Sequence, residues 1–147
     1  MDKLSMEALY RPDPEVLARA DQLPRALVFG NVRSGLNVGS IFRTADAFAL
    51  EKILLCGITA TPPHREILKT ALGSTETVSW EHCADSAIVI ARLKDAGYHI
   101  LAVEQTTEKT WLQDFQPATG TKYALDLCNE VDGVSHAVLQ LCDGDLE

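Results

Sequence analysis

The sequence predicts a single α/β domain, with a mostly parallel β-sheet and helices on both of its faces. Short apolar runs typical of buried strands alternate along the chain with segments whose apolar residues recur at helical spacing. A length of 147 residues and a hydrophobic fraction of 46% suit one domain with a substantial core. Because no signal peptide or apolar segment of membrane-spanning length is recognisable, we expect a soluble, cytoplasmic protein with no membrane partner.

The elements follow in order from local patterns. Asp13-Pro14-Glu15 combines a helix cap with proline at the first helical position, which predicts a helix within an N-terminal extension at 1–24. The predicted domain occupies 25–147. Its expected strands are 26–29, 52–56, 77–80, 98–103 and 123–128, and its expected helices are 38–48, 64–72, 86–96 and 135–142.

The loop after the first strand carries the most informative polar groups. The apolar run at 26–29 ends at Gly30, and Asn37 is a good N-cap for the helix that follows. Amide groups at a helix start favour anions. Arg33 and Arg43 add two cations near the carboxyl end of the strand, where open α/β sheets bind ligands. The loop therefore predicts a site for a phosphate or phosphodiester. It lacks both G-x-G-x-x-G and a glycine-rich loop ending in Lys-Ser/Thr, which disfavours an unrelated nucleotide-binding α/β protein.

This loop resembles the first motif of the SpoU/TrmH-type RNA ribose 2′-O-methyltransferases of the SPOUT class. The similar residues are Asn31, Arg33, Ser34, Asn37, Gly39, Arg43 and Thr44. A second match, Asn129-Glu130-Val131-Asp132-Gly133-Val134-Ser135, follows the apolar run at 123–128, and the intervening Lys69-Thr70-Ala71-Leu72-Gly73-Ser74 is also similar. The resemblance covers about 25–147. It implies the SPOUT α/β fold, whose C-terminal part is threaded as a knot.

The resemblance implies an enzyme that transfers a methyl group from S-adenosylmethionine to the ribose 2′-hydroxyl of a tRNA or rRNA nucleotide. Of the expected catalytic residues, Arg43 would orient the hydroxyl and the adjacent phosphate, and Asn37 would orient Arg43 or the ribose. The third, Glu130, would steady Arg43 or bind near the ligand. The expected cofactor-binding residues are Glu104, Gln105, Thr106, Leu127, Cys128, Asn129 and Gly133. The expected RNA-binding residues are Asn31, Arg33, Ser34, Thr44, Arg65 and Lys69. The family also implies a homodimer, with RNA lying across both subunits.

The net charge limits how RNA can bind. With 21 acidic and 13 basic residues, the chain has a formal net charge of −8, whereas proteins that bind phosphates by counterion release are usually basic. Any RNA footprint must therefore be local, at Arg33 and Arg43 or at His64, Arg65 and Lys69. For the second group a solvated helix face is an equal alternative. A partner subunit could supply further positive surface.

The cysteines and histidines predict no metal site. The cysteines, Cys56, Cys83, Cys128 and Cys142, have no C-x-x-C spacing, and three of them lie in apolar surroundings. Reduced thiols are therefore expected rather than disulfides or zinc ligands. The four histidines are scattered in the same way.

Three departures from the family pattern bear on activity. Cys128 stands where the family usually has glycine close to the cofactor, and Asp126 interrupts an apolar strand, where a carboxylate needs a partner or exposure. The sequence also stops at Leu146-Glu147, before the family's third motif. We therefore expect an incomplete cofactor pocket and an incomplete knot in this chain. The alternative is an RNA-binding or dimerising relative without transferase activity.

Overall fold

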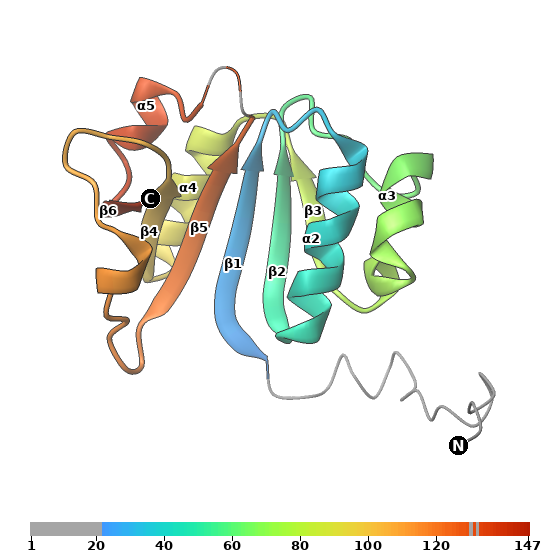
Figure 1. Ribbon diagram of the computed structural model, residues 1–147, viewed down its shortest axis with the longest axis horizontal. Coiled ribbons are helices and arrows are strands. Elements are labelled where there is room, and N and C mark those ends of the chain that lie inside the picture. Colours follow the sequence, from blue (N-terminus) through green and yellow to red (C-terminus); the bar gives the residue numbers. More distant parts are fainter. Residues whose placement is uncertain (1–21, 130, 132) are drawn as a thin grey trace.

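A six-stranded parallel sheet forms the centre of the computed structural model, which describes residues 22–129, 131 and 133–147 (Figure 1). The strand order is β3-β2-β1-β5-β4-β6, and every neighbouring pair is parallel. The strands are β1 (Leu23–Gly30), β2 (Leu50–Cys56), β3 (Trp80–Cys83), β4 (Tyr98–Val103), β5 (Lys122–Cys128) and β6 (Gly144–Leu146). The predicted α/β class is confirmed, whereas the predicted N-terminal helix lies in residues 1–21, outside the described residues.

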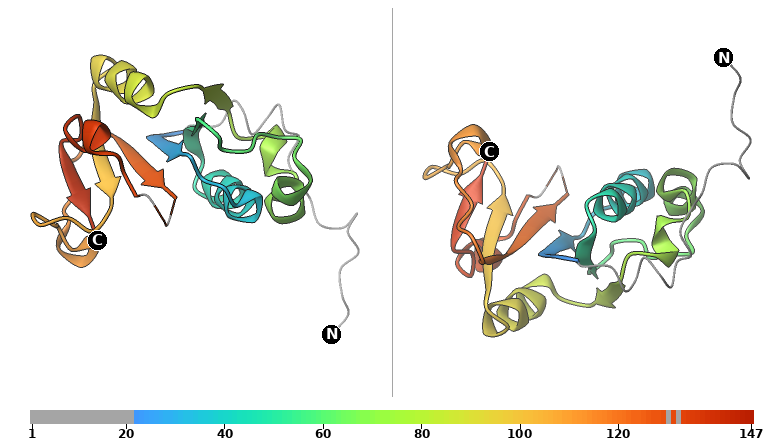
Figure 2. Two further views of the ribbon diagram at one scale, coloured as in Figure 1. Left: turned by 90° about the horizontal axis from the view of Figure 1, so that it is seen from above. Right: turned by 90° about the horizontal axis from the view of Figure 1, so that it is seen from below.

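Helices cover both faces of the sheet (Figure 2). One face carries α2 (Gly35–Ala47) and α3 (Arg65–Ala71), and the other carries α4 (Ser86–Asp95) and the short α5 (His136–Leu139). Two 3-10 turns, η1 (Ser74–Glu76) and η2 (Leu112–Asp114), complete the elements. In the described part of the chain, no helix is long and apolar enough to cross a membrane.

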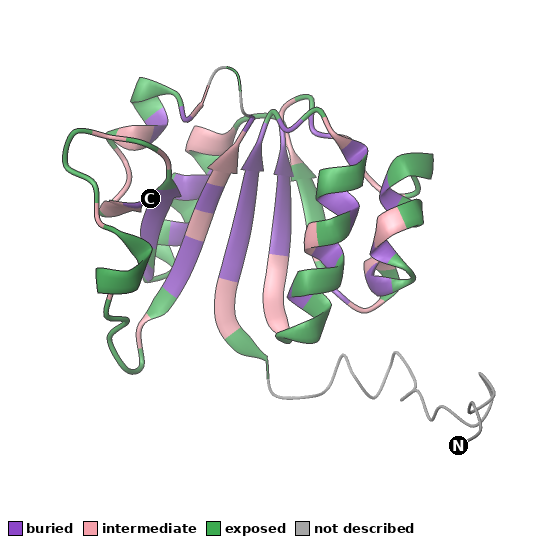
Figure 3. Ribbon diagram, viewed as in Figure 1, coloured by how far each residue is buried: buried purple, intermediate pink, exposed green. Residues whose placement is uncertain are grey.

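The core is divided between the two faces because side chains alternate along each strand. On β1, Leu27 and Phe29 pack toward α2 and α3, whereas Val28 packs toward α4. Figure 3 shows the buried residues concentrated along the central strands, with exposed residues on the outer sides of the helices. The near-continuous apolar runs in the sequence are thus explained by strands that are buried on both faces.

Several predicted boundaries were wrong. Strand β1 begins at Leu23 rather than 26, and α2 begins at Gly35 rather than 38. The third strand runs over Trp80–Cys83 rather than 77–80, because the N–H groups of Thr77 and Val78 donate back to the Ser74 carbonyl at the 3-10 turn η1, at 3.3 and 3.0 Å. The last helix is only His136–Leu139 rather than 135–142, and the chain then turns into the unpredicted strand β6.

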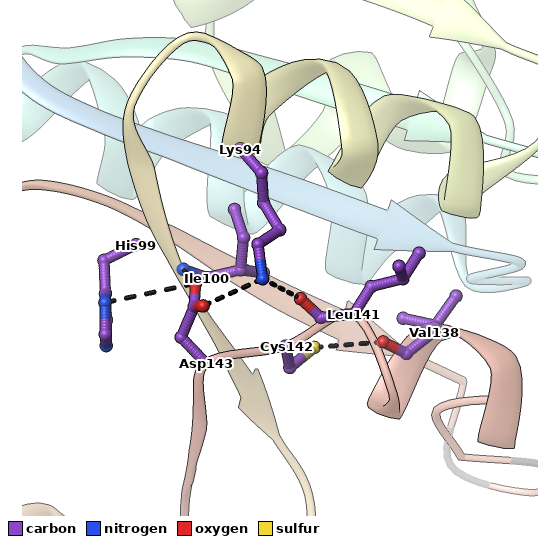
Figure 4. A network of polar contacts seen from close by, with 7 residues as sticks. All are labelled: Lys94, His99, Ile100, Val138, Leu141, Cys142 and Asp143. Atoms are coloured by element: carbon purple, nitrogen blue, oxygen red, sulfur yellow. Dashed lines mark hydrogen bonds and ion pairs between the residues drawn. The ribbon is translucent and has the colours of Figure 1, made fainter.

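A polar network holds this last turn in place (Figure 4). Lys94 Nζ donates to the Leu141 carbonyl at 2.7 Å and pairs with Asp143 Oδ1 at 2.8 Å. The N–H of Ile100 donates to Asp143 Oδ2, also at 2.8 Å. Burial acts to raise the pKa of Asp143, but the hydrogen bond from Ile100 and the ion pair with Lys94 outweigh it, so the pKa is lowered. Asp143 therefore fastens the start of β6 to α4 and β4.

Helices α2 and α3 approach each other closely at a glycine. A Cβ atom on Gly39 would lie 2.2 Å from the carbonyl oxygen of Ile67 and 2.2 Å from Thr70 Oγ1. In the same contact Thr70 Oγ1 donates to the Leu36 carbonyl at 2.8 Å. Glycine at this position is thus required by helix packing rather than by backbone conformation.

Replacing Gly39 with alanine should therefore destabilise the protein by about 1–3 kcal/mol, the usual cost of overpacking a tight contact. On an uncrowded helix the same change would stabilise the protein by about 1 kcal/mol. The sign of the change in unfolding free energy therefore shows whether Gly39 is crowded by α3. Urea denaturation measures it, with Ser40→Ala on the exposed side of α2 as the control. A gain in stability for Gly39→Ala would contradict the close packing.

Candidate functional site

A crevice lies where β1 and β5 end, side by side in the middle of the sheet. The chain leaves β1 for α2 on one face and leaves β5 for α5 on the other, so the direction of winding reverses here. Open α/β sheets bind ligands at such switch points. The crevice has a volume of about 190 Å³ and is lined by Gly30, Asn31, Arg33, Ile58, Ser86, Cys128, Asn129, Gly133 and Ser135.

The first-motif loop is fastened to the loop that follows β2. Asn31 adopts a left-handed backbone (φ 56°), and its Oδ1 accepts the N–H of Ile58 at 3.2 Å. The buried Thr59 accepts the N–H of Val32 through Oγ1 at 3.0 Å and donates to the Cys56 carbonyl at 2.7 Å. These contacts give Asn31 a structural task besides its predicted role toward RNA. Sequence reasoning missed Thr59 because its partners are distant in the chain.

Ser34, rather than Asn37, caps α2. Its Oγ accepts the N–H of Asn37 at 3.2 Å, and the helix begins at Gly35. The prediction of Asn37 as the cap was wrong because a serine with extended backbone stands at the turn before it. Asn37 is exposed within the first turns of this helix.

The second-motif loop is fastened by a carboxylate from the end of β4. Glu104 Oε2 accepts the N–H of Val134 at 2.9 Å, and a Cβ on Gly133 (φ 62°) would lie 2.3 Å from the same oxygen. The Asn129 carbonyl accepts the N–H of Gly133 at 3.1 Å, and its Oδ1 accepts the N–H of Val131 at 2.9 Å. The structure thus brings together the predicted cofactor-binding residues Glu104, Asn129 and Gly133. Glu130 lies outside the described residues, and its predicted catalytic role stays a prediction.

Four of the predicted cofactor-binding residues lie outside the lining of the crevice: Glu104, Gln105, Thr106 and Leu127. The Thr106 hydroxyl is hydrogen-bonded to the Asp145 carboxylate of β6, and Glu104 and Gln105 line a separate hollow with Leu146. Leu127 packs on the α2–α3 side of the core. Their roles toward a cofactor stay predictions.

The two unusual residues of β5 lie next to each other. Cys128 Sγ occupies the space beside Gly30, where a Cβ atom would lie 2.8 Å from it. Burial, and to a smaller extent the neighbouring Asp126 carboxylate, raise the pKa of the Cys128 thiol to about 12, so the group is a neutral thiol. The thiol donates to Asp126 Oδ2 at 3.8 Å. The Cys128 side chain therefore narrows the crevice beside Gly30.

The Asp126 carboxylate is buried and only partly hydrogen-bonded, although a carboxylate within an apolar strand was expected to need a partner or exposure. The residue is 0% exposed, and among the described residues its Oδ1 has no hydrogen-bond partner. Burial raises its pKa to about 6, and the hydrogen bond from Cys128 opposes that rise only in part. Burying this incompletely hydrogen-bonded carboxylate beneath the crevice lowers the stability of the folded protein.

A second concave site, which we call the α2–α3 groove, contains other predicted residues. It has a volume of about 470 Å³ and is lined by Ser40, Arg43, Thr44, Ala47, Phe48, Lys69, Thr70 and Leu72. Arg43, Thr44 and Lys69 thus lie together, whereas Arg65 is exposed at the start of α3 and is not part of the lining. Arg43 lies about 13 Å along the helix axis from Ser34, so the groove and the crevice are separate within one chain.

The described residues contain no group of histidine, cysteine and acidic side chains that could hold a metal ion. The four cysteines are free thiols, as predicted.

Comparison with known proteins gives a consistent result. The model of the SpoU rRNA Methylase family matches residues 24–147. A putative TrmH family tRNA/rRNA methyltransferase of Staphylococcus saprophyticus is 24% identical over 123 residues, covering 84% of this chain and 48% of the relative. The 23S rRNA (guanosine-2′-O-)-methyltransferase RlmB of Neisseria meningitidis is 24% identical over 129 residues, covering 88% and 50%. The chain spans about half the length of these curated relatives.

Solved structures show the same fold. The TrmH/SpoU tRNA modifying enzyme of A. aeolicus superposes with a TM-score of 0.77 at 19% identity, covering 91% of this chain and 66% of that chain. An AdoMet-bound rRNA methyltransferase from Sinorhizobium meliloti superposes with a TM-score of 0.76 at 21% identity, covering 88% and 49%.

Proposed function

The chain belongs to the SpoU rRNA methylase family, and on this basis we propose that it transfers a methyl group from S-adenosylmethionine to a ribose 2′-hydroxyl of tRNA or rRNA. One observation carries the proposal: the two motif loops meet at the switch-point crevice. There Asn31 and Arg33 of the first loop face Asn129 and Gly133 of the second. A site assembled from both motifs is what a two-substrate transfer requires.

The second-motif side of the crevice is suited to the cofactor. Asn129 and Gly133 line this side, and Glu104 fixes the loop that carries them. The crevice has a volume of about 190 Å³, which encloses only part of a ligand the size of S-adenosylmethionine. When bound, the cofactor supplies the sulfonium methyl group.

The RNA side is provided by α2. Arg43 is exposed in the α2–α3 groove, where its planar fork of donors can hold the ribose hydroxyl and its neighbouring phosphate. At 3.6 residues per turn, Asn37 and Arg43 project from different faces of α2, so Asn37 is better placed for the ribose than for direct contact with Arg43. Arg33 at the crevice adds a second cation.

We further propose that the protein acts as a homodimer with RNA across both subunits. Arg43 and the crevice lie apart within one chain, so a second copy is needed to bring Arg43 near a bound methyl donor. Sedimentation of the purified protein tests this, and a monomer that methylates RNA would contradict it.

Incubation with labelled S-adenosylmethionine and unmodified RNA, followed by nucleoside analysis, tests the proposed reaction. We expect label on the 2′-oxygen of a nucleoside. DNA of the same sequence is the matched control, because it lacks the hydroxyl. Label on a base, or no label when RNA binds, would contradict the proposal.

One observation favours the second candidate, an RNA-binding or dimerising relative without transferase activity. The Cys128 thiol fills space beside Gly30 that the cofactor would approach. Calorimetry separates the two candidates, because this relative would bind RNA but not S-adenosylmethionine.

Replacing Lys69 with alanine should weaken RNA binding and flatten its salt dependence. A lysine that contacts one phosphate contributes about 0.7 to the slope of log K against log salt for a single strand. Binding titrations from low to moderate salt measure this slope. The control is Lys122→Ala at the start of β5, outside the groove. An unchanged slope for Lys69→Ala would make Lys69 a solvated surface residue.

A further inference from the structure

The α2–α3 groove presents apolar side chains beside its cations. Phe48 is 63% exposed and Leu72 is 61% exposed, and both line the groove with Arg43 and Lys69. We propose that this groove binds one unpaired nucleotide of the RNA, with its base stacked on Phe48 and its phosphate at the two cations. The inference rests on the proposed function and deepens it, since it names single-stranded RNA as the substrate class.

The helix ends hold the two apolar residues at the groove. Phe48 caps α2, where its N–H donates to the Thr44 carbonyl at 3.1 Å, and Leu72 caps α3 with a left-handed backbone (φ 50°). The two helices lie side by side over the same face of the sheet (Figures 1 and 2). Because the backbone positions are set by helix termination, the exposed ring is presented on a fixed support. An aromatic ring presented in this way is a stacking platform.

The charges at the groove complement a phosphate. Among the described residues, the ion pairs include neither Arg43 nor Lys69. The nearby Asp46 instead accepts the hydroxyl of Thr77 at 2.5 Å. In a chain of net charge −8, two cations without an ionic partner in the described residues make this groove a local site for an anion.

The polar lining complements a base or ribose. The hydroxyls of Ser40 and Thr70 both donate to the Leu36 carbonyl, at 3.0 and 2.8 Å, and that of Thr44 donates to the Ser40 carbonyl at 3.2 Å. Their protons are therefore engaged, while their oxygens can still accept hydrogen bonds from base amino groups or a ribose hydroxyl.

The groove favours an unpaired nucleotide over a duplex. Within a duplex each base is stacked on its neighbours and cannot reach an aromatic side chain, whereas bases in loops can be splayed out. A volume of about 470 Å³ falls in the usual range of small-ligand sites and suits one nucleotide rather than a helix.

Fluorescence anisotropy with a labelled single-stranded oligoribonucleotide and with the matching duplex tests the inference. We expect tighter binding of the single strand. Phe48→Ala should weaken it by about 5- to 100-fold, the usual range for loss of one stacked base, without changing the salt slope. Phe48→Trp should retain affinity, and its added fluorescence should be quenched by the bound strand. The control is Ile88→Ala, a 68% exposed position on α4 across the sheet.

The outcomes separate this inference from the proposed function. If the wild type binds and methylates RNA but Phe48→Ala binds the single strand as tightly, the inference of a stacking site at Phe48 is wrong and the proposed methyltransferase function stands. Tighter binding of the duplex would overturn it as well. If Phe48→Ala dissociates a dimer without changing RNA affinity, the groove is an interface between copies and the inference is wrong. A wild type that binds no RNA would overturn both proposals.

Discussion

Replacing Arg43 with alanine should lower the rate of methyl transfer by on the order of 100- to 1,000-fold, the usual loss on removing one positioned donor from a reacting centre. The affinity for S-adenosylmethionine should stay nearly unchanged, because Arg43 lies in the α2–α3 groove and not in the crevice that is suited to the cofactor. A guanidinium that holds the hydroxyl and the phosphate in line acts mainly in the transition state, so the rate is affected more than ground-state binding.

Single-turnover rates at saturating RNA, together with calorimetric titration of the cofactor, separate these two effects. Arg43→Lys should be intermediate, because lysine keeps the charge but loses the planar fork of donors. Arg92→Ala is the matched control, since Arg92 lies on α4, on the other face of the sheet, where it pairs with Glu81 of β3. A wild-type rate for Arg43→Ala would remove Arg43 from the proposed mechanism.

Most of the fold could be predicted because buried parallel strands leave a strong pattern. The strands β1, β2, β4 and β5 are apolar runs, and each prediction overlaps the observed strand. The missing strand β6 has no such pattern: Gly144–Leu146 is held as a strand by pairing with β4 and by the contacts of Asp143. Such long-range contacts are not encoded in local periodicity.

The candidate site was predictable where it depends on the ends of strands. Parallel strands end at the same edge of a sheet, so the loops that follow β1 and β5 were expected at one edge. Because these two strands are also neighbours in the structure, Asn31, Arg33, Asn129 and Gly133 line one crevice. The sequence could not show that Thr59 fastens the first loop or that Glu104 fastens the second, since both act across the sheet edge. Nor did the motif show that Arg43 lies in a different concavity.

The buried Asp126 should make the stability of the protein fall as the pH rises from about 4 to about 6. Its pKa is raised from 3.8 to about 6 in the folded protein, with burial as the main cause. Between these values the folded state binds more protons than the unfolded state, so raising the pH favours unfolding. Above about pH 6 the carboxylate is charged in both states, and a shift of this size corresponds to a penalty of about 3 kcal/mol.

Asp126→Asn should remove that penalty because the amide cannot ionise. We expect the variant to match the wild type near pH 4 and to exceed its unfolding free energy by about 2–3 kcal/mol at pH 7. Urea denaturation at several pH values measures the unfolding free energy of both proteins. In the difference between them, the contributions of the titratable groups that they share cancel. Asp95→Asn, an exposed position at the end of α4, is the control and should track the wild type throughout. A variant that is less stable at pH 7 than the wild type would show that the Asp126 carboxylate is paired in solution, contrary to its unpartnered Oδ1 atom among the described residues.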